Sequence, residues 1–412
     1  MPIKPCSVLW TDINVNVHRK EIVNCCKRNQ RETPTVEDFK KQGIDFWTGR
    51  PEVKEDKEYF LTRMDFPPGC KGCALYHPDS RYSTHNRWKN KDIEFFNNLQ
   101  DNHTYKIEIA LSSTCNQTCM YCTPEVSSLW AKKLGLPILE PDLEWRNAMF
   151  ESLYNFIEAR LLDKEKVEYI FLGGETFLEP DFLDIIDKIS SIHNLQRQNI
   201  TIRFITNANV GPSVIQKFVD LTDKHFNIKF EVAVSIENLN HRAEAVREGL
   251  DFKRLEQNLA TLLKADNIYV GIMPSYNVFS VAELLDFHKW MLKTVTDHRS
   301  MHDFGKKWTV YMNLIYEPTY MSFGILPDNF KYYVQQTIEW VESIKDIIGK
   351  QDVKDINQYI LQLEQIKNLI GTKRKDIKFM QSAKQWYKEQ EKIHNRNYWE
   401  TFAEMELIFD SV

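Results

Sequence analysis

Short β-rich runs alternate with helical patterns from about residue 105 onward, and this alternation restricts the fold more than any other feature of the chain. Strands separated by helices are typical of βαβ units, which build parallel sheets. The predicted strands are Tyr105–Leu111, Val167–Gly173, Ile200–Thr206, Lys229–Ile236, Ile268–Met273 and Trp308–Ile315. The predicted helices between them are Trp145–Leu162, Asp181–His193, Pro212–His225, Phe252–Ala265 and Val281–Thr294. These six repeats are too few for a closed eight-fold barrel, so we expect an α/β fold with a partial (β/α)6 barrel.

The segments on either side of this alternation have a different character. The first 97 residues are polar and rich in loops, with one predicted hairpin formed by Ser7–Val15 and Glu21–Cys25. Beyond about residue 325, apolar residues recur every three or four positions, which indicates helices that pack on a core. We therefore expect an N-terminal module over residues 1–97, the barrel over 98–320 and a helical C-terminal extension over 321–412.

Composition and charge exclude several classes of protein. The net charge is −5 without a large basic block, which argues against a surface that binds nucleic acid. The N-terminus lacks a basic and then apolar signal peptide, and no run of about 18 apolar residues could span a membrane. We expect a cytoplasmic protein, in which the eight cysteines serve metal binding, catalysis or burial rather than disulfides. All eight lie at or before Cys122, so we expect any metal-binding or catalytic site built from cysteine in the first third of the chain.

Three of these cysteines stand close together directly after the first predicted barrel strand. Cys115, Cys119 and Cys122 have the spacing C-x3-C-x2-C. Three thiolates on one loop can hold three irons of a [4Fe–4S] cube and leave the fourth iron open for another ligand. Zinc usually takes four ligands in C-x2-C pairs, so the first gap of three residues fits it poorly. The triplet predicts an iron–sulfur cluster with an open iron.

This triplet resembles the signature of the radical S-adenosylmethionine (SAM) superfamily. The resemblance implies that SAM binds the open iron through its methionine group and is cleaved to a 5′-deoxyadenosyl radical, which abstracts hydrogen from a substrate. It also implies which strand ends bind SAM: a GGE motif at the second strand for the amino group, and residues after later strands for the carboxylate, ribose and adenine. Tyr121, between the last two cysteines, matches an aromatic residue near the adenine, and the strand-end positions are matched by Gly173, Gly174, Glu175, Thr206, Asn207, Ser235, Glu237 and Met273. Arg242 and Arg247 follow the fourth predicted strand, where they are expected either to clamp a carboxylate or phosphate or to lie on an exposed helix face.

A second set of cysteines lies before the barrel. Cys6, Cys25, Cys70 and Cys73 include a C-x2-C pair on a Pro-Gly loop, and four thiolates would close a second cluster fully. A zinc site with four cysteines is the alternative, and Cys26 could replace its neighbour as the ligand. The pattern is similar to the cluster-binding half of the SPASM/twitch group, and in particular to phage and bacterial twitch-domain proteins. That resemblance implies an auxiliary [4Fe–4S] cluster, here in the order opposite to most members of the group.

These features predict an oxidoreductase-type radical SAM enzyme that acts on a small molecule or a peptide. An auxiliary cluster that accepts an electron favours net oxidation or crosslinking, and a flavodoxin- or ferredoxin-type protein is the expected electron donor. The alternatives are a redox-neutral epimerase or isomerase, a radical methyl- or methylthiotransferase, and a non-catalytic iron–sulfur or zinc scaffold. Arg203, inside a predicted central strand, is expected either to be paired or to face the barrel lumen.

Overall fold

The computed structural model describes residues 6, 8–25, 33–44, 50–63, 65–70, 106–138, 140–164, 166–193, 199–298, 308–310, 313–344 and 353–409. The chain divides into two compact units, and each is described by itself. The first unit comprises Met1–Ser113, Leu139–Phe204 and His225–Lys229, and the second comprises Thr114–Ile138, Ile205–Lys224 and Phe230–Val412.

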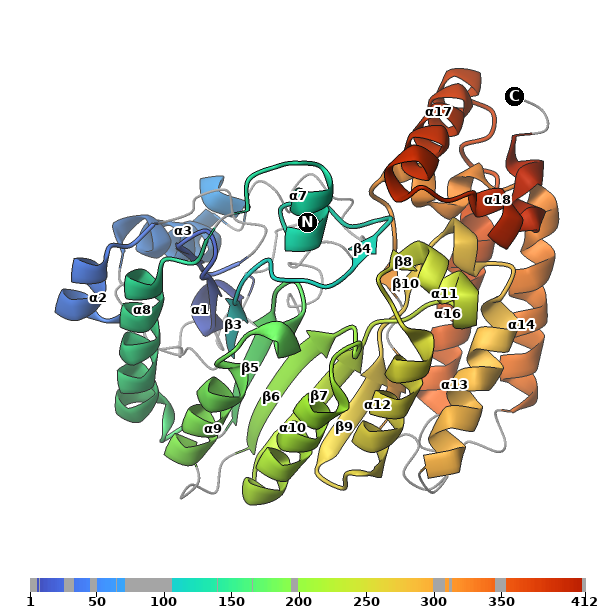
Figure 1. The fold of residues 1–412 in the computed structure, drawn as a ribbon. Coiled ribbons are helices and arrows are strands. Elements are labelled where there is room, and N and C mark those ends of the chain that lie inside the picture. Colours follow the sequence, from blue (N-terminus) through green and yellow to red (C-terminus); the bar gives the residue numbers. More distant parts are fainter. Residues whose placement is uncertain are drawn as a thin grey trace. The chain divides into compact units, whose positions relative to one another are not determined.

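Parallel strands form the centre of the first unit. Strands β3 (Lys106–Ala110), β5 (Lys166–Leu172) and β6 (Asn199–Thr206) pair in parallel, and every second side chain of β5 is buried. Tyr169 and Phe171 on this buried face contact α9 (Phe182–His193), which lies beside the strands in Figure 1. Helix α8 (Leu143–Phe156) precedes β5 and continues into one π-helical turn, Ile157–Leu161.

The predicted N-terminal hairpin forms, and it extends this sheet. Strands β1 (Asp12–Asn16) and β2 (Glu21–Val23) pair antiparallel, as predicted. Residues Val8–Thr11 form the helical turn α1 instead of a strand, because all four side chains are buried and give no alternating pattern. Strand β1 also pairs in parallel with β3, from Asp12 opposite Lys106 to Asn16 opposite Ala110. The same unit contains α2 (Val36–Gln42) and α3 (Pro51–Arg63).

The second unit contains the later strands of the alternation. Strand β9 (Ile268–Ile272) lies between β7 (Lys229–Val234) and β11 (Trp308–Val310), and both pairings are parallel. Its longer helices are α10 (Pro212–Lys224), α12 (Phe252–Lys264) and α13 (Leu284–His298). Its shorter elements are β4 (Thr118–Cys119), α7 (Ser128–Lys133), α11 (Asn240–Val246), β8 (Arg247–Glu248), β10 (Ser275–Tyr276) and β12 (Asn313–Leu314).

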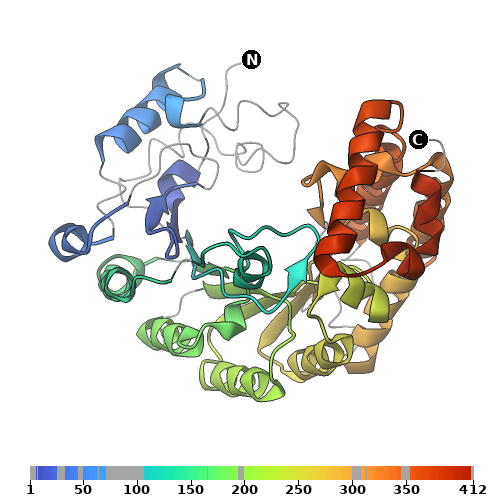
Figure 2. The same cartoon turned by 45° about the horizontal axis from the view of Figure 1, so that its top comes forward.

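Helices dominate the C-terminal part of the second unit. They are α14 (Lys331–Ser343), α16 (Val353–Leu369), α17 (Ile377–His394) and α18 (Tyr398–Thr401). Helices α14 and α16 pack side by side, and Figure 2 shows α17 and α18 from above. Of the apolar stripes predicted for this segment, Val334 and Ile366 are among the buried members, whereas Ile356 and Ile360 are half-buried. No helix in the described ranges is long and apolar enough to cross a membrane.

The structure confirms the predicted α/β class. Each predicted strand and helix of the alternation forms, although the last predicted strand is divided into β11 and β12. Parallel strands alternating with helices are the architecture expected for a partial radical SAM barrel followed by a helical extension.

Phe204 lies in the aromatic core of the first unit and provides a test of its packing. Its ring contacts Phe177 and Phe182 at centroid distances of 5.0 and 5.1 Å. We expect Phe204→Ala to lower the free energy of unfolding by about 3–5 kcal/mol, measured by urea denaturation, because the cavity cannot fully close. Phe226→Ala is the matched control, since that ring is 77% exposed and its loss should cost less than about 0.5 kcal/mol. Equal losses in the two variants would contradict this core.

Candidate functional site

The cysteine triplet lies on a loop that α7 and its cap hold in place. Cys119 is buried, and Cys115 and Cys122 are half-buried. The Cys115 amide donates to Ser128 Oγ at 3.2 Å, and the Trp130 indole N–H donates to the Cys119 carbonyl at 2.9 Å. The thiol of Cys119 is close enough to the other two thiols to interact with them electrostatically. The loop therefore presents three sulfurs together.

The short strand β8 fixes the other side of this cysteine loop. Strand β4, which contains Cys119, pairs antiparallel with β8, and the pair is visible in Figure 1. The next residue, Gly249, has a φ of +97°, and a Cβ placed on it would lie 2.5 Å from the Asn116 carbonyl oxygen. Only glycine allows the two segments to approach this closely.

A buried ion pair lies against Cys119. The Arg247 guanidinium donates to both carboxylate oxygens of Glu237, with a shortest distance of 2.6 Å. The Tyr121 hydroxyl donates to the same carboxylate at 3.0 Å. Arg247 Nη1 also lies 3.9 Å from the Cys119 sulfur, within reach of a weak hydrogen bond. Three of the predicted cofactor residues thus form one network with a cluster cysteine.

Burial raises the pKa of the Cys119 thiol well above its usual range, and the nearby Arg247 guanidinium opposes that rise. Burial also raises the pKa of the Cys122 thiol. Both thiols are therefore protonated at neutral pH when no metal is bound, and iron would have to displace their protons. The positive charge of Arg247 favours the thiolate that iron requires.

The end of β6 connects to the cysteine loop through asparagine side chains. The Asn207 side-chain N–H donates to Asn116 Oδ1 at 2.8 Å, and the Asn116 side-chain N–H donates to the Asn209 carbonyl at 2.7 Å. Thr206 accepts a hydrogen bond at its carbonyl from the Ser235 amide, at 2.8 Å. Met273 is half-buried after β9, and its amide donates to the Val234 carbonyl at 2.8 Å. Thr206, Asn207, Ser235 and Met273 therefore follow strand ends of the second unit, as predicted.

The GGE segment belongs to the first unit, at the end of β5. The Gly174 amide donates to the Ser112 carbonyl at 3.0 Å. Gly173 has a φ of +154°, and a Cβ on it would lie 2.9 Å from that same oxygen, so a side chain would not fit. Glu175 is buried, and one of its carboxylate oxygens accepts from the Phe177 amide at 3.1 Å. The segment has the close backbone approach that the sequence predicted.

The upstream cysteines are described only in part. Cys6 is buried before α1, Cys25 is half-buried after β2, and Cys70 ends the short 3-10 turn Pro68–Cys70. Cys73 and Cys26 lie outside the described residues. Auxiliary metal binding by Cys6, Cys25, Cys70 and Cys73 stays a prediction.

The donor set of the triplet is of the kind that an iron–sulfur cube takes. In a cube each thiolate binds a different iron, so three thiolates on one loop can hold three irons. Thiols are soft ligands, which suit iron–sulfur clusters.

Sequence reasoning missed several residues that shape the site. Asn116 lies between the cysteines, Gly249 follows Arg247, and Glu248 accepts from Thr118 Oγ1 at 2.7 Å. Glycine in a strand-like pattern is a sequence signal for close backbone approach, and it could have identified Gly249. Of the other charged candidates, Arg203 is paired with Glu168 at 2.9 Å and Arg242 with Glu404.

Gly249 tests the close approach of β8 to the cysteine loop. We expect Gly249→Ala to lower the melting temperature and the iron bound after anaerobic reconstitution, because the new Cβ displaces the Asn116 backbone. Gly135→Ala is the matched control, since Gly135 also has a positive φ, +67°, but has no atom within 4 Å of the added Cβ. The control should cost only the left-handed strain of about 1–2 kcal/mol and leave iron binding unchanged. Equal effects of both substitutions would contradict the proposed contact.

The ion pair next to Cys119 gives a second test. We expect Glu237→Gln to lower the free energy of unfolding by about 3–5 kcal/mol in denaturant titrations, because it leaves the Arg247 charge buried without its carboxylate. Asp297→Asn breaks the exposed Lys293–Asp297 pair and should cost only about 0.3–0.5 kcal/mol. A Glu237→Gln variant as stable as this control would show that the pair is not buried in solution.

Part of the chain is similar to known proteins. Residues 109–291 match the Radical SAM superfamily. Molybdenum cofactor biosynthesis protein 1 of Mus musculus is 26% identical over 215 residues, which make up 49% of this chain and 32% of that protein. The GTP 3′,8-cyclase of Sulfurovum sp. is 29% identical over 125 residues, 30% of this chain and 33% of the cyclase. That of Sulfurimonas denitrificans is 25% identical over 188 residues, 44% of this chain and 51% of the cyclase.

The chain therefore spans only about a third to a half of the length of these relatives. The matched segment nevertheless includes the cysteine loop, the GGE segment, Glu237 and Arg247. The similarity to the Radical SAM superfamily thus covers residues 109–291, which are fewer than half of the chain.

Proposed function

We propose that the chain is a radical SAM enzyme that abstracts a hydrogen atom from its substrate. The observation that carries this proposal is the loop with the buried Cys119 and the half-buried Cys115 and Cys122, within a segment that matches the superfamily. When bound, a [4Fe–4S] cluster supplies one electron to SAM, which gives methionine and the 5′-deoxyadenosyl radical that takes hydrogen from the substrate.

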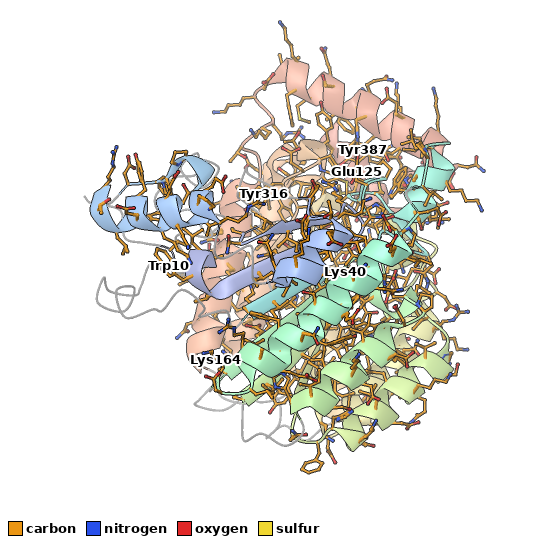
Figure 3. All side chains as sticks on the ribbon, turned by 90° about the vertical axis from the view of Figure 1, so that its left-hand side faces the viewer. Trp10, Lys40, Glu125, Lys164, Tyr316 and Tyr387 are labelled. Carbon is orange, nitrogen blue, oxygen red and sulfur yellow. The ribbon has the colours of Figure 1, made fainter. Side chains whose placement is uncertain are left out.

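In this proposal the residues of the chain bind and orient the cofactors. Cys115, Cys119 and Cys122 hold three irons, and the Arg247 charge offsets the negative charge of the Cys119 thiolate. We propose that Gly174 and Glu175 bind the methionine amino group and that Asn207 binds the methionine carboxylate. Glu125, which is labelled in Figure 3, follows Cys122 by three residues in the sequence, and its side chain is exposed to solvent.

The remaining contacts concern the nucleoside part of SAM. Ser235 follows β7 and is proposed to bind the ribose, and Met273 and Tyr121 are proposed to lie against the adenine. Glu237 and Arg247 already neutralise each other, so we propose that their main contribution is to fix Tyr121 and the Cys119 thiolate. A direct contact of either with SAM stays a prediction.

We propose two candidate reactions for the step that follows hydrogen abstraction. The sequence favoured net oxidation or crosslinking, with an auxiliary cluster at Cys6, Cys25, Cys70 and Cys73 as the electron acceptor. The relatives reported above include GTP 3′,8-cyclases, whose name describes a ring closure. This similarity supports a radical rearrangement as the second candidate reaction. A small-molecule or peptide substrate and a flavodoxin- or ferredoxin-type donor complete the proposal. GTP is the first compound to test, by whether it raises 5′-deoxyadenosine formation above the rate without substrate.

Anaerobic reconstitution tests the central proposal. The wild-type chain, reduced with dithionite in the presence of SAM, should form 5′-deoxyadenosine, detected by liquid chromatography. Cys115→Ala should abolish this product, because the cluster loses one of its three ligands. Cys70→Ala is the matched control and should lose only iron or zinc of the auxiliary site while product formation without substrate continues. A Cys115→Ala variant with wild-type product formation would refute the proposal, and a wild type that binds metal without product would favour a scaffold.

A further inference from the structure

Glu248 gathers hydrogen-bond donors from three separate segments of the second unit. Its carboxylate oxygen Oε2 accepts from Thr118 Oγ1 at 2.7 Å and from His394 Nδ1 at 2.5 Å, and it is paired with Lys133. Thr118 directly precedes Cys119, and Lys133 ends α7, just downstream of Cys122. His394 is 146 residues away in sequence, at the end of α17. One carboxylate thus joins a residue inside the cysteine triplet and the end of α7 to the C-terminal extension.

His394 contacts the cysteine loop in a second way. Its imidazole packs edge-on against the Trp130 indole, with ring centroids 5.0 Å apart. The same indole donates to the Cys119 carbonyl. The His394 side chain is only 1% exposed, whereas the Glu248 side chain is 32% exposed. A carboxylate only accepts hydrogen bonds, so in the contact with Glu248 the donor is Nδ1; Lys133 Nζ also lies 3.4 Å from this nitrogen.

The segment that carries His394 is itself anchored next to β8. Asn395 caps the C-terminal end of α17 and has a left-handed φ of 46°. Arg396 then donates to the Glu244 carbonyl of α11 at 2.9 Å, and Arg242 of α11 pairs with Glu404. The Arg242 guanidinium also lies 4.7 Å from the centre of the Phe402 ring. Since α11 leads directly into β8, these contacts fix the chain on both sides of the Glu248–His394 hydrogen bond.

We propose that His394 is a positioning residue for the cluster, which acts through Glu248 and Trp130 to hold the Thr118–Cys119 segment in its metal-binding conformation. The C-terminal extension is then part of the cluster site rather than an appendage. This inference rests on the proposed function, in that the loop is taken to hold the cluster.

Hydrogen exchange in the metal-free protein tests the structural half of the inference without any activity. We expect His394→Ala to raise amide exchange in peptides covering residues 114–133 about tenfold, because a hydrogen bond to a charged group is lost. His394→Asn should restore most of the protection, since its side-chain amide can replace Nδ1–H. If His394→Ala fails to fold, the isosteric Glu248→Gln replaces it, with the same direction expected.

Tyr387→Phe is the matched control. Tyr387, labelled in Figure 3, is buried on the same helix, and its hydroxyl donates to the Tyr320 carbonyl at 2.6 Å. This variant also removes one buried hydrogen bond of α17, but it should leave exchange in residues 114–133 unchanged. Unchanged exchange there in folded His394→Ala, or an equal rise in Tyr387→Phe, would overturn the inference.

Iron release from the reconstituted protein tests the cluster half. With a chelator in excess, His394→Ala should lose iron about tenfold faster than wild type, since residues that support metal ligands usually affect affinity by about 10- to 100-fold. Wild-type release rates in His394→Ala would overturn the inference while leaving the proposed function intact. A wild type that retains iron but forms no 5′-deoxyadenosine would refute the proposed function, and the release rates would still decide the role of His394.

Discussion

The antiparallel pairing of Thr118–Cys119 with Arg247–Glu248 is the contact on which the rest of the site depends. Consecutive side chains of a strand point to opposite faces, so this short pairing supports the loop from two sides. Arg247 interacts with the Cys119 sulfur and Glu237, and Glu248 interacts with Thr118, Lys133 and His394. On one face, Arg247 provides the positive charge that favours a Cys119 thiolate. On the other face, Glu248 holds the backbone segment that contains Cys119.

The buried pair of Arg247 and Glu237 is costly by itself. Removing two charges from water costs several kcal/mol for each ion, and their attraction compensates only when the remaining polar groups are also satisfied. Here Tyr121 donates to the carboxylate, and the Ser275 amide lies 3.4 Å from it. The guanidinium in turn reaches the Cys119 sulfur. A charged network in such a position is typical of sites where function, rather than stability alone, selects the residues.

The sequence predicted the parts of the fold that depend on local periodicity. Alternating or continuous apolar runs identified strands β3, β5, β6, β7, β9 and β11, and the spacing of the cysteines identified the loop. Contacts between distant segments carry no such local signal. The hydrogen bond between Glu248 and His394 joins positions 146 residues apart, and His394 looked like any polar residue near a helix end. The Asn116 contacts and the helical turn at Val8–Thr11 were missed for the same reason, because tertiary packing decides them.

The pairing of strand β1 with β3 affects how the first unit folds during synthesis and how it would respond to truncation. An open sheet exposes unpaired N–H and C=O groups along its outer strand, and such edges readily pair with other chains. The hairpin β1–β2 covers the edge of β3 that faces away from β5. During synthesis β1 emerges about 90 residues before its partner β3, so this protection arrives through a long-range, slowly closed contact. Removal of the first 97 residues would therefore uncover a β-edge and favour aggregation, even though the predicted barrel itself would be left whole.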